Sequence, residues 1–145
     1  MFAPNAVTVY NVCPDGSVWM SFLDGVFLET AQVDSVSKNG VIRDGNATLF
    51  IPFDCVAVDA ATSQVQQFCP PGDFDRLVNR SGFWTVGPQN TRSCVDCFFV
   101  RGKVVEPDLA FAEIHDRFQD AFRVSSVFTR DFGSRNMRHW QIGGK

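Results

Sequence analysis

Two cysteines separated by two residues, Cys94 and Cys97, form the pair in this sequence best suited to chemistry. Such a pair can supply half of a zinc site or the dithiol of a redox centre. A structural zinc site needs two further ligands at close spacing; none follows, and the two histidines, His115 and His139, lie far apart. The next residues, Phe98-Phe99-Val100, predict a strand, whereas a redox pair normally opens a helix. We therefore expect structural thiols and no metal, with a zinc or thiol protein using Cys94 and Cys97 as an alternative.

Catalytic signatures are missing from the sequence. It contains no Gly-x-Ser-x-Gly nucleophile elbow, no phosphate-binding loop and no dinucleotide-binding fingerprint. Thirteen aspartates stand against three glutamates, but most, including Asp15, Asp24 and Asp44, precede glycine or lie in predicted turns. Aspartate favours turns because its side chain can bond to nearby backbone groups. We expect no catalytic residue, no cofactor and no enzymatic activity.

The charge of the chain argues against tight binding of nucleic acid. The net charge is −3 and the sequence pI is about 5.2, whereas proteins that grip phosphates usually show a basic patch and a high pI. The longest basic cluster is the loose set Arg130, Arg135 and Arg138. We expect contact with DNA only of the passive kind that a channel wall makes.

Cysteine usage and hydropathy indicate where the protein is made. Five cysteines at irregular spacing make a poor disulfide framework. The first residues have neither the basic start nor the apolar stretch of a signal peptide. No apolar run approaches the roughly 20 residues that span a membrane. We expect a protein made in a cytoplasm, with reduced thiols and no membrane contact.

The chain of 145 residues is expected to form one β-rich domain, residues 1–145. Its 15 phenylalanines suit pleated, half-buried surfaces. Asp24-Gly25 is a tight hairpin signal between two short strands. Short strands at regular spacing predict a mainly β fold, a barrel or sandwich of about eight antiparallel strands. The predicted strands are 6–12, 17–23, 25–31, 47–53, 83–86, 97–100, 122–128 and 137–142.

Two segments depart from this pattern. Residues 32–46 are polar and longer than most connections without structure. We expect either an extended β-ribbon with its tip at Lys38-Asn39-Gly40 or a mobile loop. Residues 107–121 carry apolar residues at helical spacing after Pro107, which predicts one α-helix of about four turns in the C-terminal half.

The most distinctive stretch of the sequence runs from Phe132 to Lys145. Its composition predicts a hairpin that turns at Gly133 and closes with a strand at 137–142. The last three residues, Gly143-Gly144-Lys145, are expected to be a free end in position to reach a neighbour.

This stretch resembles the end of an uncharacterised family of small virion-morphogenesis proteins from phages and prophages, mainly of Gram-positive bacteria. Members of that family end in Gly-Ser-x-x-Met-x-His-Trp-x-x-Gly-Gly, which is matched here from Gly133 to Gly144. They also have strands similar to 6–11 and 48–52 and a step similar to Gly82-Phe83-Trp84-Thr85. The resemblance covers most of the chain in order, although residues 55–74 depart from it.

The layout also resembles that of head–tail connector proteins of the stopper, or head-completion, type. Those proteins are small β-barrels that form a ring under the portal and adaptor, and a long loop from each subunit closes the DNA channel. The resemblance implies that residues 32–46 are this loop. It implies as partners copies of the same chain, the adaptor and portal proteins above, and the tail tube or terminator protein below.

The sequence therefore predicts a non-enzymatic virion protein in the neck of a tailed phage, which helps to retain packaged DNA. A tail terminator or another minor virion protein is the first alternative. A cytoplasmic binding module is an alternative of another class. The candidate channel-loop residues are Val36, Ser37, Lys38, Asn39, Gly40 and Val41, and the candidate residues for contact with a subunit or partner are Met137, His139, Trp140 and Gly143.

Overall fold

A computed structural model describes residues 5–37, 40–74, 76–88, 95–104, 111–118, 120–134 and 137–145, with the backbone alone for 31–45. The described chain is mainly β with two helices, which confirms the predicted fold class. None of these helices is long and apolar enough to cross a membrane. The elements are β1 Asn5–Val12, β2 Val18–Ser37, β3 Gly40–Pro52, β4 Val56–Asp59, β5 Gln67–Phe68, α1 Pro71–Phe74, β6 Phe83–Trp84, β7 Asp96–Arg101, α2 Phe111–Arg117, β8 Ala121–Arg130 and β9 His139–Gly144.

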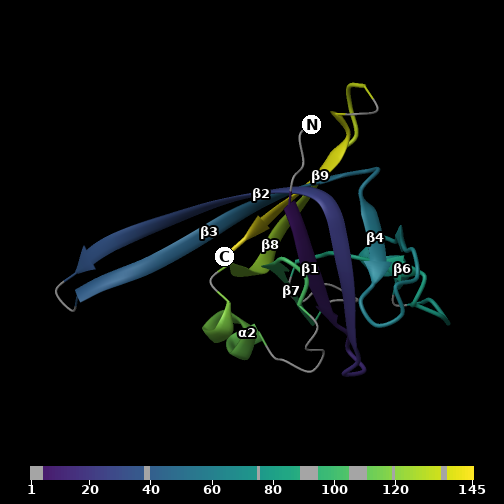
Figure 1. The fold of residues 1–145 in the computed structure, drawn as a ribbon, viewed down its shortest axis with the longest axis horizontal. Helices are drawn as coiled ribbons and strands as arrows, with labels where there is room; N and C mark the ends of the chain where they lie inside the picture. Colours follow the sequence, from purple (N-terminus) through teal and green to yellow (C-terminus); the bar gives the residue numbers. More distant parts are fainter. Residues whose placement is uncertain are drawn as a thin grey trace.

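Six of the strands close into an antiparallel barrel (Figure 1). The pairings run from β1 to β7, β8, β9, β3 and β2, and β2 pairs again with β1. Closure removes the free edges that an open sheet would present along this wall. Of the two architectures that the strand pattern allowed, the pairings support the barrel. Strand β4 adds to the wall beside the first half of β2.

The long strand β2 bends at Gly25, where the sequence predicted a hairpin turn. That prediction is wrong: β2 runs without a break from Val18 to Ser37. The pairing with β1 shifts by one residue between Ala6↔Asp24 and Asn5↔Val26, which leaves Gly25 as an extra residue with φ of +77°. A glycine in the left-handed region is typical of a β-bulge that bends its strand. Before the bulge β2 pairs with β1 and β4, and after it β2 pairs with β3.

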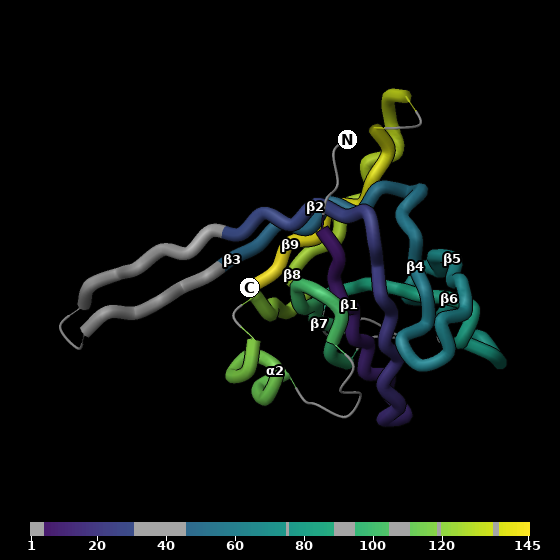
Figure 2. Tube along the Cα trace, in the orientation of Figure 1, coloured from purple at the N-terminus to yellow at the C-terminus, as the bar shows by residue number. Residues whose placement is uncertain are grey.

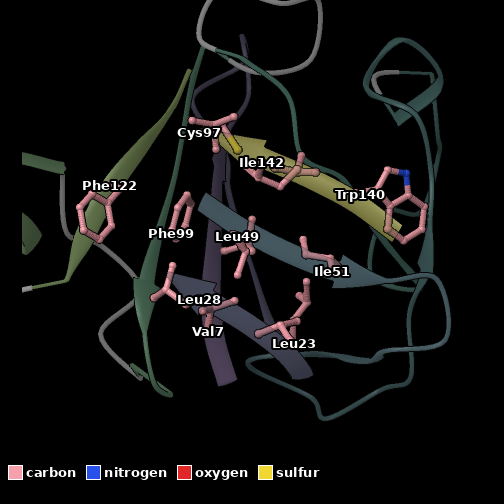
Figure 3. Close-up of a cluster of buried hydrophobic side chains, with 14 of the residues drawn as sticks. Val7, Leu23, Leu28, Leu49, Ile51, Cys97, Phe99, Phe122, Trp140 and Ile142 are labelled. Carbon is pink, nitrogen blue, oxygen red and sulfur yellow. The ribbon is translucent and has the colours of Figure 1, made fainter. Parts of the chain in front are cut away.

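The interior of the barrel is filled by alternate residues from all six strands. Figure 3 shows Leu23, Leu49, Phe99 and Ile142, among others, converging on this interior. Most of these side chains have no exposed surface at all. Because successive residues of a strand point to opposite faces, the β-branched and aromatic alternation of the sequence produces this core directly.

A second layer covers the outer face of β1 and β7. Tyr10 stacks on Phe98 with 4.8 Å between ring centroids, and Phe111 of α2 lies 5.3 Å from Phe98. Ile114, also in α2, is fully buried against this cluster. Strands β1 and β7 are therefore buried on both faces, as their nearly continuous burial shows. Strands β4, β5 and β6 lie on the side of the barrel away from the β2–β3 ribbon (Figure 2).

Helix α2 ends earlier than the sequence predicted. Its described part spans Phe111–Arg117, and residues 107–110 of the predicted helix lie outside the described residues. At the other end, Ala121 is the first residue of β8 and pairs with Val100 of β7. The small apolar side chain of Ala121 suits the apolar face of a helix as well as the wall of a barrel. Pairing with β7 places this residue in a strand.

The bulge gives a direct test of this architecture. Gly25→Ala should lower the free energy of unfolding by about 1–2 kcal/mol, because a side chain at positive φ is strained even where space is open. Urea unfolding measures the change. Gly72→Ala is the matched control, since Gly72 also has open space but no positive φ, and it should cost less than about 0.5 kcal/mol. Equal losses at both positions would contradict the bulge.

Candidate functional site

The predicted channel loop is the end of a two-stranded β-ribbon. Strands β2 and β3 pair continuously from Phe27↔Phe50 to Ser37↔Gly40, with Val36 opposite Val41. Of the two alternatives for residues 32–46, the described backbone forms the ribbon. Lys38 and Asn39, the predicted tip, lie outside the described residues. The ribbon runs out from the barrel in Figure 1.

Beyond the barrel wall, the two strands of the ribbon pair only with each other in the described structure. The pairing of β1 with β2 ends at Val26, and that of β9 with β3 ends at Ala47. At about 3.3 Å per residue, the stretch of β2 beyond the wall, from Ala31 to Ser37, extends about 20 Å. A two-stranded hairpin of this kind is only marginally stable alone in water. The barrel therefore does not support this part of the ribbon by strand pairing in the described residues.

The sequence of the ribbon is mostly polar beyond the barrel wall. Leu28 and Leu49 face each other in the barrel wall, and the same face continues outward with Gln32 opposite Gly45. Further out, Asp34 stands opposite Arg43 in the backbone register. By sequence, this part of the ribbon has no long apolar stretch to bury against the core.

Of the predicted contact residues, Trp140 lies in the core. Its side chain is 8% exposed, and its ring centroid lies 4.4 Å from those of Phe53 and Phe68 and 5.5 Å from that of Trp84. This packing leaves Trp140 little surface for a partner. His139, one residue earlier, is half-buried; its Nδ1 lies 2.8 Å from the carbonyl oxygen of Met137.

The chain end is not free, which corrects the sequence prediction. Gly143 and Gly144 belong to β9 and lie between β3 and β8. The Lys145 N–H donates to the carbonyl oxygen of Arg123 at 3.0 Å, and the Lys145 carbonyl accepts from the Arg123 N–H at 3.1 Å. The last residues therefore complete the barrel seam rather than reach a neighbour.

The two final glycines lie in close packing within the subunit. A Cβ at Gly143 would collide with the Oγ of Ser126, which lies at the bulge of β8. A Cβ at Gly144 would lie 2.8 Å from Phe122 Cβ and 2.8 Å from Phe99 Cζ. Real Cβ atoms almost never approach so closely, so packing explains Gly144; at Gly143 a rotation of the Ser126 hydroxyl could relieve the contact. The same geometry makes Gly143 a poor candidate for partner contact.

Met137 is the one predicted contact residue with a large exposed apolar surface. It is 61% exposed, and its side chain packs beside Gly133, whose φ is +85°. Phe132 is 67% exposed and Phe128 is 49% exposed on the same β8–β9 hairpin. We call Phe128, Phe132 and Met137 the hairpin tip. Sequence reasoning missed the two phenylalanines, because alternation predicts a strand but not where that strand leaves the barrel.

The thiols give little support to the zinc or redox alternative. Cys94 lies outside the described residues, and Cys97 is fully buried in the barrel interior. Burial, with a smaller effect of Asp54, raises the pKa of the Cys55 thiol to about 12, which keeps it protonated at neutral pH. Among the described residues, no group of three His, Cys, Asp or Glu side chains could hold a metal.

Stability measurements can separate the core residue from the surface residue of this stretch. Trp140→Ala should lower the free energy of unfolding by about 3–5 kcal/mol, the usual cost of truncating a buried aromatic side chain. Met137→Ala should change it by less than about 0.5 kcal/mol, because that side chain is mostly in solvent. Urea unfolding measures both. A Trp140 variant as stable as the Met137 variant would show that Trp140 is not in the core.

Comparison with known proteins gives one match. The model of a family described as a family of unknown function, DUF6751, matches residues 2–145. No curated protein matches the chain, and no solved structure does. The matched range includes the whole barrel, the β2–β3 ribbon and the hairpin tip. The chain therefore belongs to the family of unknown function DUF6751.

Proposed function

We propose that this protein is a non-enzymatic virion subunit in the neck of a tailed phage, a stopper-like head–tail connector that helps to retain packaged DNA. The observation that carries the proposal is the β2–β3 ribbon, which extends from a closed barrel and pairs only with itself beyond the wall. A ring of such subunits would bring one ribbon from each copy toward the central channel. There the ribbons would support one another, which offsets their marginal stability as isolated hairpins.

The chemistry of the ribbon suits a gate that DNA passes without sticking. Residues 29–46 carry three acidic and two basic side chains, so the segment is slightly acidic. DNA is held mainly by cations that neutralise its phosphates. A polar, slightly acidic ribbon can obstruct a channel mechanically and still release DNA when it moves aside. Contact with DNA in this proposal is passive.

The barrel would serve as the rigid body of each ring subunit. A closed barrel presents few unpaired strand edges, so it does not polymerise by edge-to-edge pairing. In the proposal, copies of the chain form the ring, the portal and adaptor proteins bind above it, and the tail tube or terminator protein binds below. The protein would be made in the host cytoplasm and function in the virion.

Shortening the ribbon tests the gating role. Replacing residues 36–41 by Asn-Gly joins Ser35 to Ile42, which already pair, through a two-residue turn that suits a hairpin. The subunit should fold with little change in unfolding free energy, because the barrel is untouched. Particles assembled with it should lose packaged DNA, measured as nuclease-sensitive DNA after capsid filling.

The matched control keeps the length of the ribbon and changes only its chemistry. Val36→Thr with Val41→Thr retains a β-branched pair at the same register, so particles with this variant should keep their DNA. Particles with the shortened ribbon that retain DNA as well as the control would contradict gating by the ribbon.

A further inference from the structure

The hairpin tip is an apolar surface that the subunit itself leaves uncovered. Phe132 and Met137 are each more than 60% exposed, and Phe128 is covered on one side by Arg130, whose guanidinium lies 5.0 Å from the ring centroid. Arg138 pairs with Asp131 at 3.4 Å across the same hairpin. The hairpin is thus held in shape by its own side chains while its largest apolar groups face solvent. Exposed aromatic groups with an arginine beside them are typical of interface anchors.

A cavity that could receive such a group lies on the same molecule. It has a volume of about 330 Å³ and opens between the start of β2 and the end of β4. Its apolar wall is formed by Val18, Trp19, Met20, Ala60 and Ala61. This volume is at the lower end of small-ligand pockets, roughly 300–1,000 Å³, and is sufficient for one aromatic side chain. At the edge of the cavity, the Asp59 carboxylate accepts hydrogen bonds from the backbone N–H groups of Ala61 and Thr62.

The tip and the cavity lie at opposite ends of the molecule. In Figure 1 the β8–β9 hairpin rises at the top of the view, whereas the turn between β1 and β2, next to the cavity, is at the bottom. A tip therefore cannot reach the cavity of its own subunit. A contact between them joins two copies through different surfaces, and such heterologous contacts propagate into rings or chains of subunits.

Charge favours the same pairing. Residues 128–139 contain three arginines and one aspartate, while the whole chain has a net charge of −3, so the rest of the chain is acidic. A basic tip is attracted to the remainder of a second copy and repelled by a second tip. Like-charge contact disfavours a symmetric tip-to-tip dimer, and the opposite charges favour the heterologous arrangement.

We propose that the hairpin tip of one copy docks into the β2–β4 cavity of the next copy, with Phe132 as the inserted side chain. The occupant of the cavity is therefore a second copy of this chain. The closing of such contacts into a ring rests on the proposed function, whereas the contact itself does not. Aromatic anchors of this kind carry much of the binding free energy of an interface.

Sedimentation of three variants tests the contact with purified protein. Phe132→Ala removes the anchor and Ala61→Arg fills the mouth of the cavity; both positions are exposed, so thermal unfolding should be unchanged. Each variant alone should self-associate with a dissociation constant raised at least about tenfold over the original chain. Val78→Ala is the control, because Val78 is fully exposed and belongs to neither surface.

Mixing the two variants gives the sharper result. The Ala61→Arg copy keeps an intact tip and the Phe132→Ala copy keeps an intact cavity, so the mixture should form dimers that neither variant forms alone. A tip-to-tip contact predicts no such rescue. Absence of rescue, or an original chain that stays monomeric, overturns the proposal; if Ala61→Arg fails to fold, Thr62→Arg at the same cavity replaces it.

The outcome is independent of the neck role. Rescue by mixing, together with absence of the protein from phage particles, would leave the contact standing and remove the proposed function. A neck ring whose subunits meet through other surfaces would support the proposed function and contradict the contact between the hairpin tip and the cavity.

Discussion

The bend of β2 at Gly25 is the constraint on which the rest of the structure depends. One strand has to pair with β1 in the barrel wall and then leave that wall with β3. The extra residue Gly25, at positive φ, changes the direction of the strand without ending it. Without the bulge, β2 would have to remain in the wall or stop at Val26. If β2 remained in the wall, it could not form the ribbon with β3. If it stopped at Val26, the barrel would lose the pairing of β2 with β3 that closes it.

The seam at β9 is the second constraint, and it acts at the other end of the chain. Strand β9 fits between β3 and β8 because Gly144 has no side chain to collide with Phe122 and Phe99. Trp140, earlier in the same strand, packs on Phe53 and Phe68. The C-terminal motif is therefore a folding motif first. Met137 lies in the part of the hairpin beyond the barrel and is largely exposed.

The sequence predicted the features that depend on local pattern. The β class follows from alternation, whereas the polar segment 32–46 left two alternatives, a ribbon or a mobile loop, and strand pairing decides between them. Asp24-Gly25 misled because a turn signal and a bulge signal use the same residue, and only pairing with β1 distinguishes them. Ala121 misled because its helical spacing competes with a long-range pairing to Val100. Contacts between distant strands, such as Gly144 against Phe99, leave no local signal, so the role of the final glycines was not predictable.

Cryo-electron microscopy of the intact particle at its portal vertex tests the central claim most directly. The account predicts a ring of this chain between the portal–adaptor assembly and the tail, with the β2–β3 ribbons directed into the channel. A ring that lies directly on the end of the tail tube, with no ribbons in the lumen, would indicate a tail terminator instead. Absence of the chain from the particle, or its presence only on the capsid surface, would contradict the account.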